Sequence, residues 1–290
     1  MRIPGLRGIS PMVIVKEAVN DFLDDDMTTY ASALAYQVFF SIFPFIIFLI
    51  ALLGFLNLSS FFDWLREQAQ LVLPQQAMEP VNQVISDLQQ EKGGIMSIGV
   101  IVALWSASAA VRATMNALNV AYDVKEGRPA WKLYPLSILY TIGLAAMMIL
   151  ATVLLVVGPE AVQWVARYIH MEDLFVTLWT WLRWPAALIL LILVVAIVYY
   201  IAPDVEQKFR FITPGAAFAV LVWIAASVAF NFYVSNFSDY NATYGSIGTI
   251  IVLLLYFFIS AAVMLFGAEI NAVIEHHMPE GKNPGEKSMH

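Results

Sequence analysis

A stripe of aromatic, hydroxyl, cationic and amide side chains runs along one apolar stretch of the sequence. Trp105, Ser108, Arg112, Asn116 and Asn119 are separated by three or four residues, so in a helix they lie on one face. An arginine inside a membrane-spanning helix is costly unless it has a partner or reaches water. Two interpretations of Arg112 are open. It extends its charge from the cytoplasmic end of the helix into the headgroup region, or it binds an anion or an anionic headgroup in an inward-facing cavity.

A second polar face occurs in an earlier apolar stretch, where Gln37, Ser41 and Pro44 lie together. Pro44 has no N–H to donate, which leaves the carbonyl group of Phe40 without its usual partner. The pattern indicates either a kink that Ser41 repairs or a break in the helix at a substrate site, as transporters use.

Glu269 ends the charge-free run 240–268. Its carboxyl group can form an ion pair with Arg112 across a helix bundle, or it can exchange a proton, and both interpretations are open. We therefore treat the following residues as candidate substrate-binding residues, with Pro44 as a candidate helix break: Arg112, Asn116, Ser108, Gln37, Ser41 and Glu269.

The same run carries small and hydroxyl side chains on one face. They are Gly245, Thr249, Tyr256, Ser260 and Gly267. Such a face favours close packing between helices over the lining of a pore.

Composition excludes several classes of protein. Apolar residues make up 60% of the chain and charged residues 13%, against about a quarter charged in soluble domains, and the mean hydropathy is +0.74. No basic block indicates binding to nucleic acid. The chain has no cysteine, and its adjacent His276 and His277 make a poor metal pair. No catalytic or nucleotide-binding motif is present, so we expect no enzyme activity, no cofactor and no metal.

The elements that must position these residues are membrane-spanning helices. Six charge-free windows are long enough to cross a bilayer core of about 30 Å. They predict an all-α membrane protein with spans at about 32–56, 94–117, 134–157, 181–201, 214–236 and 246–269. With the N-terminus in the cytoplasm, eleven of the 15 lysines and arginines lie inside and four lie outside. Cytoplasmic segments carry the excess of these residues, so we predict that both termini are cytoplasmic.

Amphipathic segments flank the spans. Ser10 and Pro11 are typical of a helix start. The apolar residues that follow at helical spacing predict an N-terminal helix on the membrane surface. They are Met12, Val15, Val19, Phe22 and Leu23. The long segment 57–92 predicts amphipathic outer helices between the first two spans. We expect one membrane domain, residues 1–275, and a disordered cytoplasmic tail, 276–290.

Several short motifs occur in a characteristic order along the chain. They are Ala33-Leu34-Ala35-Tyr36 with Ser41-Ile42-Phe43-Pro44, Trp105-Ser106-Ala107-Ser108, Asn119 with Tyr122, Tyr200 with Pro203, Pro214-Gly215-Ala216 with Trp223, Tyr244-Gly245-Ser246, and Gly267-Ala268-Glu269 with Asn271. By these motifs the chain resembles the YihY/BrkB family of bacterial inner-membrane proteins over residues 12–274.

The resemblance implies six spanning helices, cytoplasmic termini and a place in the bacterial inner membrane. The family has carried a ribonuclease label, but a metal-dependent nuclease needs a cluster of His, Asp or Glu, and the sequence shows none at a suitable spacing. Its associations with virulence and the cell envelope imply handling of lipids or envelope precursors.

Three functions follow, in decreasing order of preference. The first is transport or translocation of a lipid or an anionic amphipathic envelope solute. The second is a non-catalytic envelope scaffold or regulatory membrane protein. The third is a membrane-bound hydrolase. The expected partners are membrane lipids, with a homo-oligomer or an envelope protein as further possibilities.

Overall fold

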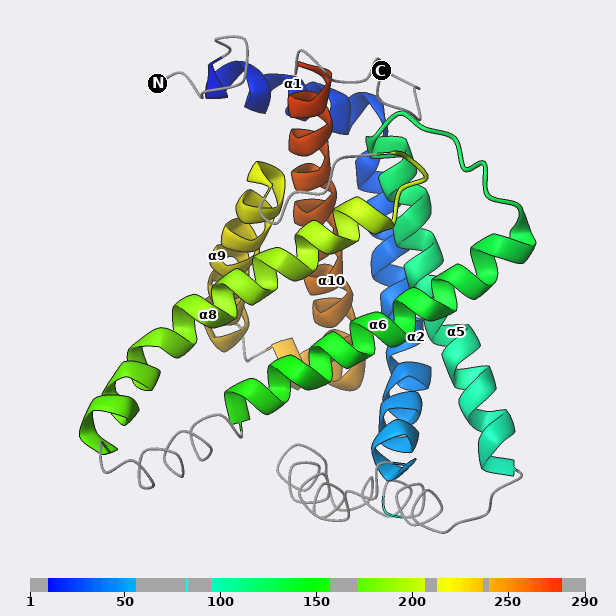
Figure 1. Ribbon diagram of the computed structural model, residues 1–290, viewed down its shortest axis with the longest axis vertical. Coiled ribbons are helices and arrows are strands. Elements are labelled where there is room, and N and C mark those ends of the chain that lie inside the picture. The colour runs from blue at the N-terminus through cyan, green and yellow to red at the C-terminus, as the bar shows by residue number, and fades with distance from the viewer. Residues whose placement is uncertain are drawn as a thin grey trace.

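The computed structural model describes residues 10–55, 82, 95–156, 172–206, 213–236 and 240–277, and this part of the chain folds into seven α-helices without a strand (Figure 1). The helices are α1 (Pro11–Asp24), α2 (Met27–Phe55), α5 (Ile95–Ala121), α6 (Ala130–Val156), α8 (Glu172–Ile201), α9 (Pro214–Asn236) and α10 (Tyr240–His276). The predicted all-α class is confirmed.

Four of the described helices are long and apolar enough to cross a membrane: α5, α8, α9 and α10. The helices α2 and α6 coincide with the other two predicted spans and contain 29 and 27 residues. At about 1.5 Å per residue each is roughly 40 Å long, more than a bilayer core requires. The assignment of six spans and the orientation of the termini stay predictions. The predicted outer helices in 57–92, apart from Asn82, and the tail after His277 lie outside the described residues.

The N-terminal helix α1 begins at Pro11 as predicted and lies across the end of the bundle at which α10 ends (Figure 1). Its buried face consists of Ile14 and Ala18, which form a cluster with Ile270, Val273 and Ile274 of α10. Four residues of the apolar stripe seen in the sequence lie on a different, exposed face: Met12, Val15, Val19 and Leu23. The fifth, Phe22, is half-buried and packs against Phe266 of α10. The helix therefore has one apolar face for α10 and a second that suits a membrane surface.

Two glycines allow α9 and α10 to approach each other closely. A Cβ atom on Gly215 would lie 2.0 Å from the carbonyl oxygen of Gly267, and one on Gly267 would lie 2.7 Å from the Cβ of Ala219. Asn271 of α10 completes the contact, because its Oδ1 accepts a hydrogen bond of 2.9 Å from the N–H of Gly215. It thereby satisfies a donor of the first turn of α9.

The polar residues farther along α10 also contact α9. Trp223 Nε1 donates to Ser260 Oγ at 3.1 Å, and the hydroxyl groups of Ser227 and Tyr256 lie 3.0 Å apart. Close helix packing, predicted from the small-residue face, accounts for Gly267, Ser260 and Tyr256.

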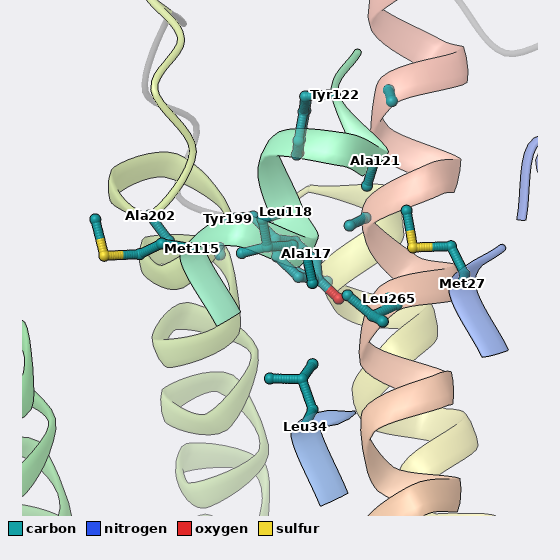
Figure 2. Close-up of a cluster of buried hydrophobic side chains, with 14 of the residues drawn as sticks. Met27, Leu34, Met115, Ala117, Leu118, Ala121, Tyr122, Tyr199, Ala202 and Leu265 are labelled. Carbon is teal, nitrogen blue, oxygen red and sulfur yellow. The ribbon is translucent and has the colours of Figure 1, made fainter. Parts of the chain in front are cut away.

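The buried hydrophobic core lies where α2, α5, α8 and α10 meet (Figure 2). Its largest members are Met27, Met115, Leu118, Tyr199 and Leu265, each at most 1% exposed. This cluster fixes the rotation of α5 about its axis, because Met115 and Leu118 must face inward. The rotation in turn decides which way the polar stripe of α5 points.

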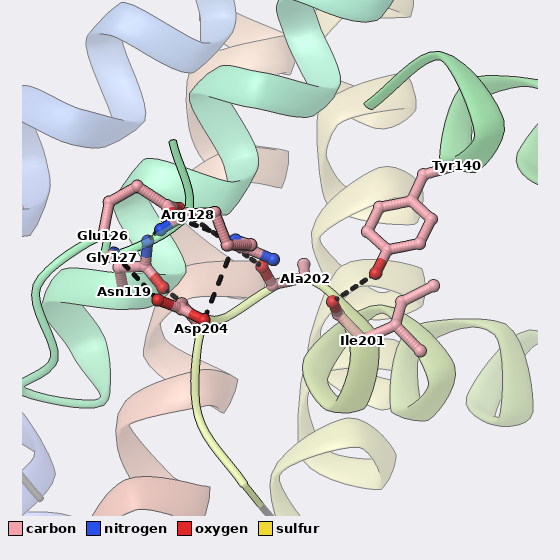
Figure 3. A network of polar contacts seen from close by, with 8 residues as sticks. All are labelled: Asn119, Glu126, Gly127, Arg128, Tyr140, Ile201, Ala202 and Asp204. Carbon is pink, nitrogen blue, oxygen red and sulfur yellow. Dashed lines mark hydrogen bonds and ion pairs between the residues drawn. The ribbon is translucent and has the colours of Figure 1, made fainter. Parts of the chain in front are cut away.

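A polar network joins the α5–α6 connection to the end of α8 (Figure 3). Arg128 binds the Glu126 carboxylate through Nε at 2.7 Å and through Nη2 at 2.7 Å, and Nη2 also donates to the carbonyl of Ala202 at 3.0 Å. Asn119 donates to Glu126 at 2.8 Å and accepts from the N–H of Asp204 at 2.6 Å. Asn119, the last residue of the sequence stripe, therefore belongs to this network.

Candidate functional site

The guanidinium group of Arg112 lies between α5 and α6 and is held by two serine hydroxyls. Its Nη1 donates to Ser108 Oγ at 2.6 Å and to Ser137 Oγ of α6 at 3.1 Å. Each serine donates its own proton to a carbonyl one turn earlier, Trp105 and Tyr134 respectively, both at 2.7 Å. The hydroxyl oxygens therefore present lone pairs to the arginine, which is the arrangement a cation requires.

Two aromatic rings complete the contacts of Arg112. The indole of Trp105 and the phenol ring of Tyr134 are stacked, with centroids 5.1 Å apart and planes at 16°. The guanidinium carbon lies 5.5 Å from the first centroid and 4.6 Å from the second, within the range of cation–π attraction. Both rings are on the surface, 49% and 36% exposed. The cation is thus held at a site that opens to the outside of the bundle.

The direction of the Arg112 side chain tests one of the two interpretations. The nearer end of α5 is Ala121, nine residues on, or about 14 Å along the axis. Arg112 nevertheless bonds to Ser108 and lies over Trp105, both of which precede it in the helix. The side chain points away from the nearer helix end, whereas snorkelling requires it to point toward that end.

Most of the hydrogen-bonding capacity of Arg112 is unused by the described residues. A guanidinium has five N–H donors. The two bonds to serine both come from Nη1, which leaves the two N–H groups of Nη2 and the one of Nε. In the described part of the chain, no Asp or Glu lies within ion-pair distance of Arg112. As far as the described residues go, the charge of Arg112 is uncompensated and three of its N–H donors have no partner.

The other predicted substrate-binding residues have different surroundings. Asn116 is exposed, Gln37 is half-buried on α2, and Ser41 donates to the carbonyl of Ser106 over a long 3.4 Å. Glu269 is buried near the end of α10 and makes no ion pair with Arg112. In the described part of the chain, Ser108 is the member of the predicted set that hydrogen-bonds to Arg112.

Sequence reasoning missed Ser137 and Tyr134 as members of the site. Both lie on α6, one turn apart, and only the crossing of α5 by α6 brings them to Arg112 (Figure 1). The three-residue spacing of an aromatic and a serine, repeated in Trp105 and Ser108, was the available signal. The proposed break at Pro44 is not seen, because α2 runs without interruption from Met27 to Phe55.

An apolar cavity of about 260 Å³ lies elsewhere in the bundle. It is lined from five helices, among others by Leu34, Thr114, Leu191, Trp223 and Met264. Thr114 follows Arg112 by two residues, which puts the two side chains on roughly opposite sides of α5. The cavity and the Arg112 site are therefore separate features.

No metal site is found within the described ranges, where no three His, Asp or Glu side chains stand close enough to share an ion. His277 instead lies 3.3 Å from the carboxylate of Glu17 on α1.

Comparison with known proteins gives matches across most of the chain. A family model described as "Virulence factor BrkB" matches residues 18–290. "Putative ribonuclease-like protein YfkH" of Bacillus subtilis (strain 168) is 36% identical over 280 residues, which cover 96% of this chain and 100% of that protein. A UPF0761 membrane protein of Xanthomonas campestris pv. campestris (strain B100) is 22% identical over 259 residues, 86% of this chain but only 57% of that protein's length. No solved structure matches the chain.

Proposed function

This chain belongs to the BrkB family of membrane proteins, as the sequence resemblance predicted, and we propose that it translocates a lipid or another anionic amphipathic solute of the cell envelope. In this proposal Arg112 holds the anionic group of the cargo, and the apolar part of the cargo stays in the surrounding lipid.

The observation that carries the proposal is the set of unused donors on Arg112. Nε and Nη2 of an arginine form a planar fork that matches two oxygens of a phosphate or carboxylate. Ser108 and Ser137 engage Nη1 alone, so they orient the group without occupying that fork. An uncompensated cation at membrane depth is costly, and a bound anion would remove that cost.

The aromatic pair gives the cargo a route to the arginine. Trp105 and Tyr134 are both exposed on the outer surface of the bundle and both contact the guanidinium group. A headgroup that passes these rings reaches Arg112 from the side, from within a leaflet, without crossing the packed core.

The membrane arrangement forms part of the same proposal. We place six spans, α2, α5, α6, α8, α9 and α10, across the bacterial inner membrane with both termini in the cytoplasm. The packing of α1 against the last turns of α10 supports an even number of crossings, because it puts the beginning of the first described helix and the end of the last one at the same end of the bundle. The exposed apolar face of α1 then rests on the cytoplasmic surface.

The function in the name of the Bacillus relative does not enter the proposal. A ribonuclease site requires general acid–base groups or a metal cluster around a phosphate. The described side chains around Arg112 are hydroxyl and aromatic, which suits binding and not hydrolysis.

The test uses purified protein in liposomes that contain a trace of fluorescent anionic or zwitterionic lipid. A membrane-impermeant quencher reports the fraction of label on the outer leaflet. Wild-type protein is expected to make extra anionic label accessible, and Arg112→Ala is expected to abolish this extra fraction. Lys132→Ala is the matched control, since Lys132 is another cation over a ring, that of Trp131, but it is exposed and makes no contact with the site.

Two results would contradict the proposal. One is folded wild-type protein that leaves the accessible fraction unchanged for all labels, which would favour the scaffold or regulatory function. The other is an Arg112→Ala variant that translocates as well as wild type.

A further inference from the structure

A buried carboxyl group with one unpartnered oxygen lies at the end of the bundle that α1 covers. Glu269 of α10 is 1% exposed, and its Oε1 has no hydrogen-bond partner among the described residues. An ionised carboxylate in such a place is strongly disfavoured unless a cation or several donors surround it.

The charged groups that act on Glu269 are all acidic. They are Asp25, which caps the C-terminal end of α1, Asp21 of α1, and Asp123 in the turn after α5. No cation of the described residues lies within ion-pair distance of the carboxyl group. These neighbours therefore increase the cost of a negative charge on Glu269.

The packed elements contribute further titratable groups at this end of the bundle. They are Lys16, Glu17 and Asp24 of α1, Asp26 just before α2, Tyr30 of α2, Tyr122 and Lys125 after α5, Tyr199 of α8, Glu275 and His276 of α10, and His277 directly after it. Helix α9 has no Asp, Glu, His, Lys or Arg.

The geometry favours a proton over a metal ion as the species that neutralises Glu269. In the parts of the chain that are described, no three acidic or histidine side chains are close enough to share a metal. A proton needs only one carboxyl group. Its removal to water leaves a carboxylate, and its return restores the neutral acid.

Asp21 and Asp25 give this carboxyl group a connection to solvent. Both are half-buried at the end of α1, between the exposed surface and the packed interior. Burial, together with the charge of Asp123, raises the pKa of Asp25 to about 6, and burial also raises the pKa of Asp21. Carboxyl groups with a raised pKa at the edge of the interior are suited to passing protons between water and a buried acid.

We infer that Glu269 is a reversible proton-binding site whose occupancy holds α1 against the end of α10. This proton site does not depend on the cargo or on Arg112. It can be disproved while the proposed translocation stands, and the translocation can be disproved while the proton site stands.

Loss of the proton places a negative charge opposite Asp21 of α1 and opposite Asp25, the residue that caps its C-terminal end. Repulsion then opposes the apolar contact of Ile14 and Ala18 with α10. Because docking of α1 favours the protonated form of Glu269, docking is strongest at low pH and weakens as the pH rises. The pair between His277 and Glu17 joins the same two helices and is also charged only when the histidine is protonated, so the test must separate the two effects.

The absence of cysteine from the chain allows a clean reporter. Ile14→Cys places a thiol at a position that is 4% exposed while α1 is docked, and Asn20→Cys places one at an exposed polar position of α1 outside both of its apolar faces. The full-length protein, in liposomes, is labelled with a membrane-impermeant maleimide from about pH 5 to pH 9. The ratio of the two labelling rates cancels the pH dependence of the thiol chemistry and reports undocking of α1 alone.

The ratio is expected to rise with pH in the wild-type background. Glu269→Gln keeps the shape of the side chain and removes the charge, so the ratio at high pH should be lower than in the wild-type background. The decrease should be about tenfold for each unit by which the pKa of Glu269 differs between docked and undocked α1. Asp25→Asn should reduce the ratio in the same direction, because it removes one of the charges that repel an ionised Glu269. The pair between His277 and Glu17 is intact in both variants, so it cannot produce these differences.

The inference would be overturned by a ratio that does not change with pH in the wild-type background. It would equally be overturned by Glu269→Gln and Asp25→Asn variants that both keep the wild-type pH profile.

Discussion

Arg112 and Arg128 are two arginines of the same helical bundle with opposite surroundings. Arg128 binds both oxygens of Glu126, lies 3.9 Å from Asp204 and donates to the carbonyl of Ala202. Arg112 bonds only to Ser108 and Ser137, and no carboxylate of the described residues compensates its charge. The fork of Arg128 is occupied by the protein itself, while that of Arg112 is open.

The difference separates a structural arginine from a binding one. A charge-assisted, bidentate pair such as Arg128–Glu126 joins chain segments and leaves little for a ligand. Serine hydroxyls and aromatic faces fix a guanidinium in position without neutralising it. The first arrangement should therefore matter for stability, and the second for affinity.

The largest effect on stability is expected from Arg128→Ala. The substitution leaves the carboxylates of Glu126 and Asp204 without their cation in a site where the arginine side chain is only 14% exposed. Removal of one member of a buried pair costs about 3–5 kcal/mol, and for this partly exposed pair we expect about 2 kcal/mol. The measurement is the thermal unfolding midpoint in detergent, read from tryptophan fluorescence. An unchanged unfolding midpoint would show that Arg128 does not stabilise the fold.

A smaller effect is expected on acidification. Burial alone would raise the pKa of Glu126, but hydrogen bonds from Arg128 and Asn119 outweigh burial and hold this pKa below its usual value of 4.5. A lowered pKa in the folded state means that the contribution is complete above the unfolded pKa and is lost as the pH falls through the folded one.

Wild-type protein should therefore lose part of its thermal stability below about pH 4.5, and Glu126→Gln should lose less over the same range. Unfolding midpoints of both proteins at a series of pH values give the comparison. Parallel profiles would show that the network does not depend on the ionised carboxylate.

The smallest effect on stability is expected from Arg112→Ala. The residue makes two hydrogen bonds and two cation–π contacts at a half-exposed site, and its removal also relieves an uncompensated charge. These contributions oppose one another, so we expect a change of about 1 kcal/mol or less. A loss as large as that of Arg128→Ala would place Arg112 among the structural residues.

The sequence predicted the helices far better than the site. Charge-free windows predicted the bounds of α9 as observed and the ends of the other spanning helices to within nine residues. The reason is that a long apolar segment in lipid must form a helix to satisfy its backbone hydrogen bonds. The helix ends near the membrane surface were harder to predict. The helix α10 continues to His276, beyond the predicted end at residue 269, since its last turns are covered by α1 and not by lipid.

Helical spacing predicted that Ser108 and Arg112 lie together, because both are on one helix. It could not identify Ser137 and Tyr134, whose contact with Arg112 depends on how α6 crosses α5. The inclusion of Asn116 among the residues around Arg112 stays a prediction, because it lies one turn from Arg112 on α5 and is exposed. Spacing puts it on the polar face, but only packing decides that this part of the face is exposed.

The pairing of Glu269 with Arg112 was one of two interpretations that the sequence left open. Both residues are single charges in apolar helices, and a sequence gives no distance between them. In the structure Glu269 lies beneath α1 among aspartates, while Arg112 faces α6. The two charges thus belong to different regions of the molecule.

The most direct test of the central claim compares lipid retention by the two arginine variants. Wild type, Arg112→Ala and Arg128→Ala are extracted from membranes that contain equal amounts of phosphatidylglycerol and phosphatidylethanolamine, and the lipids that stay bound are counted by native mass spectrometry. We predict that wild type and Arg128→Ala retain phosphatidylglycerol, and that Arg112→Ala loses about tenfold of this preference, the value of one well-formed charge-assisted contact. Equal retention by wild type and Arg112→Ala would contradict the assignment of Arg112 as the residue that binds an anionic headgroup.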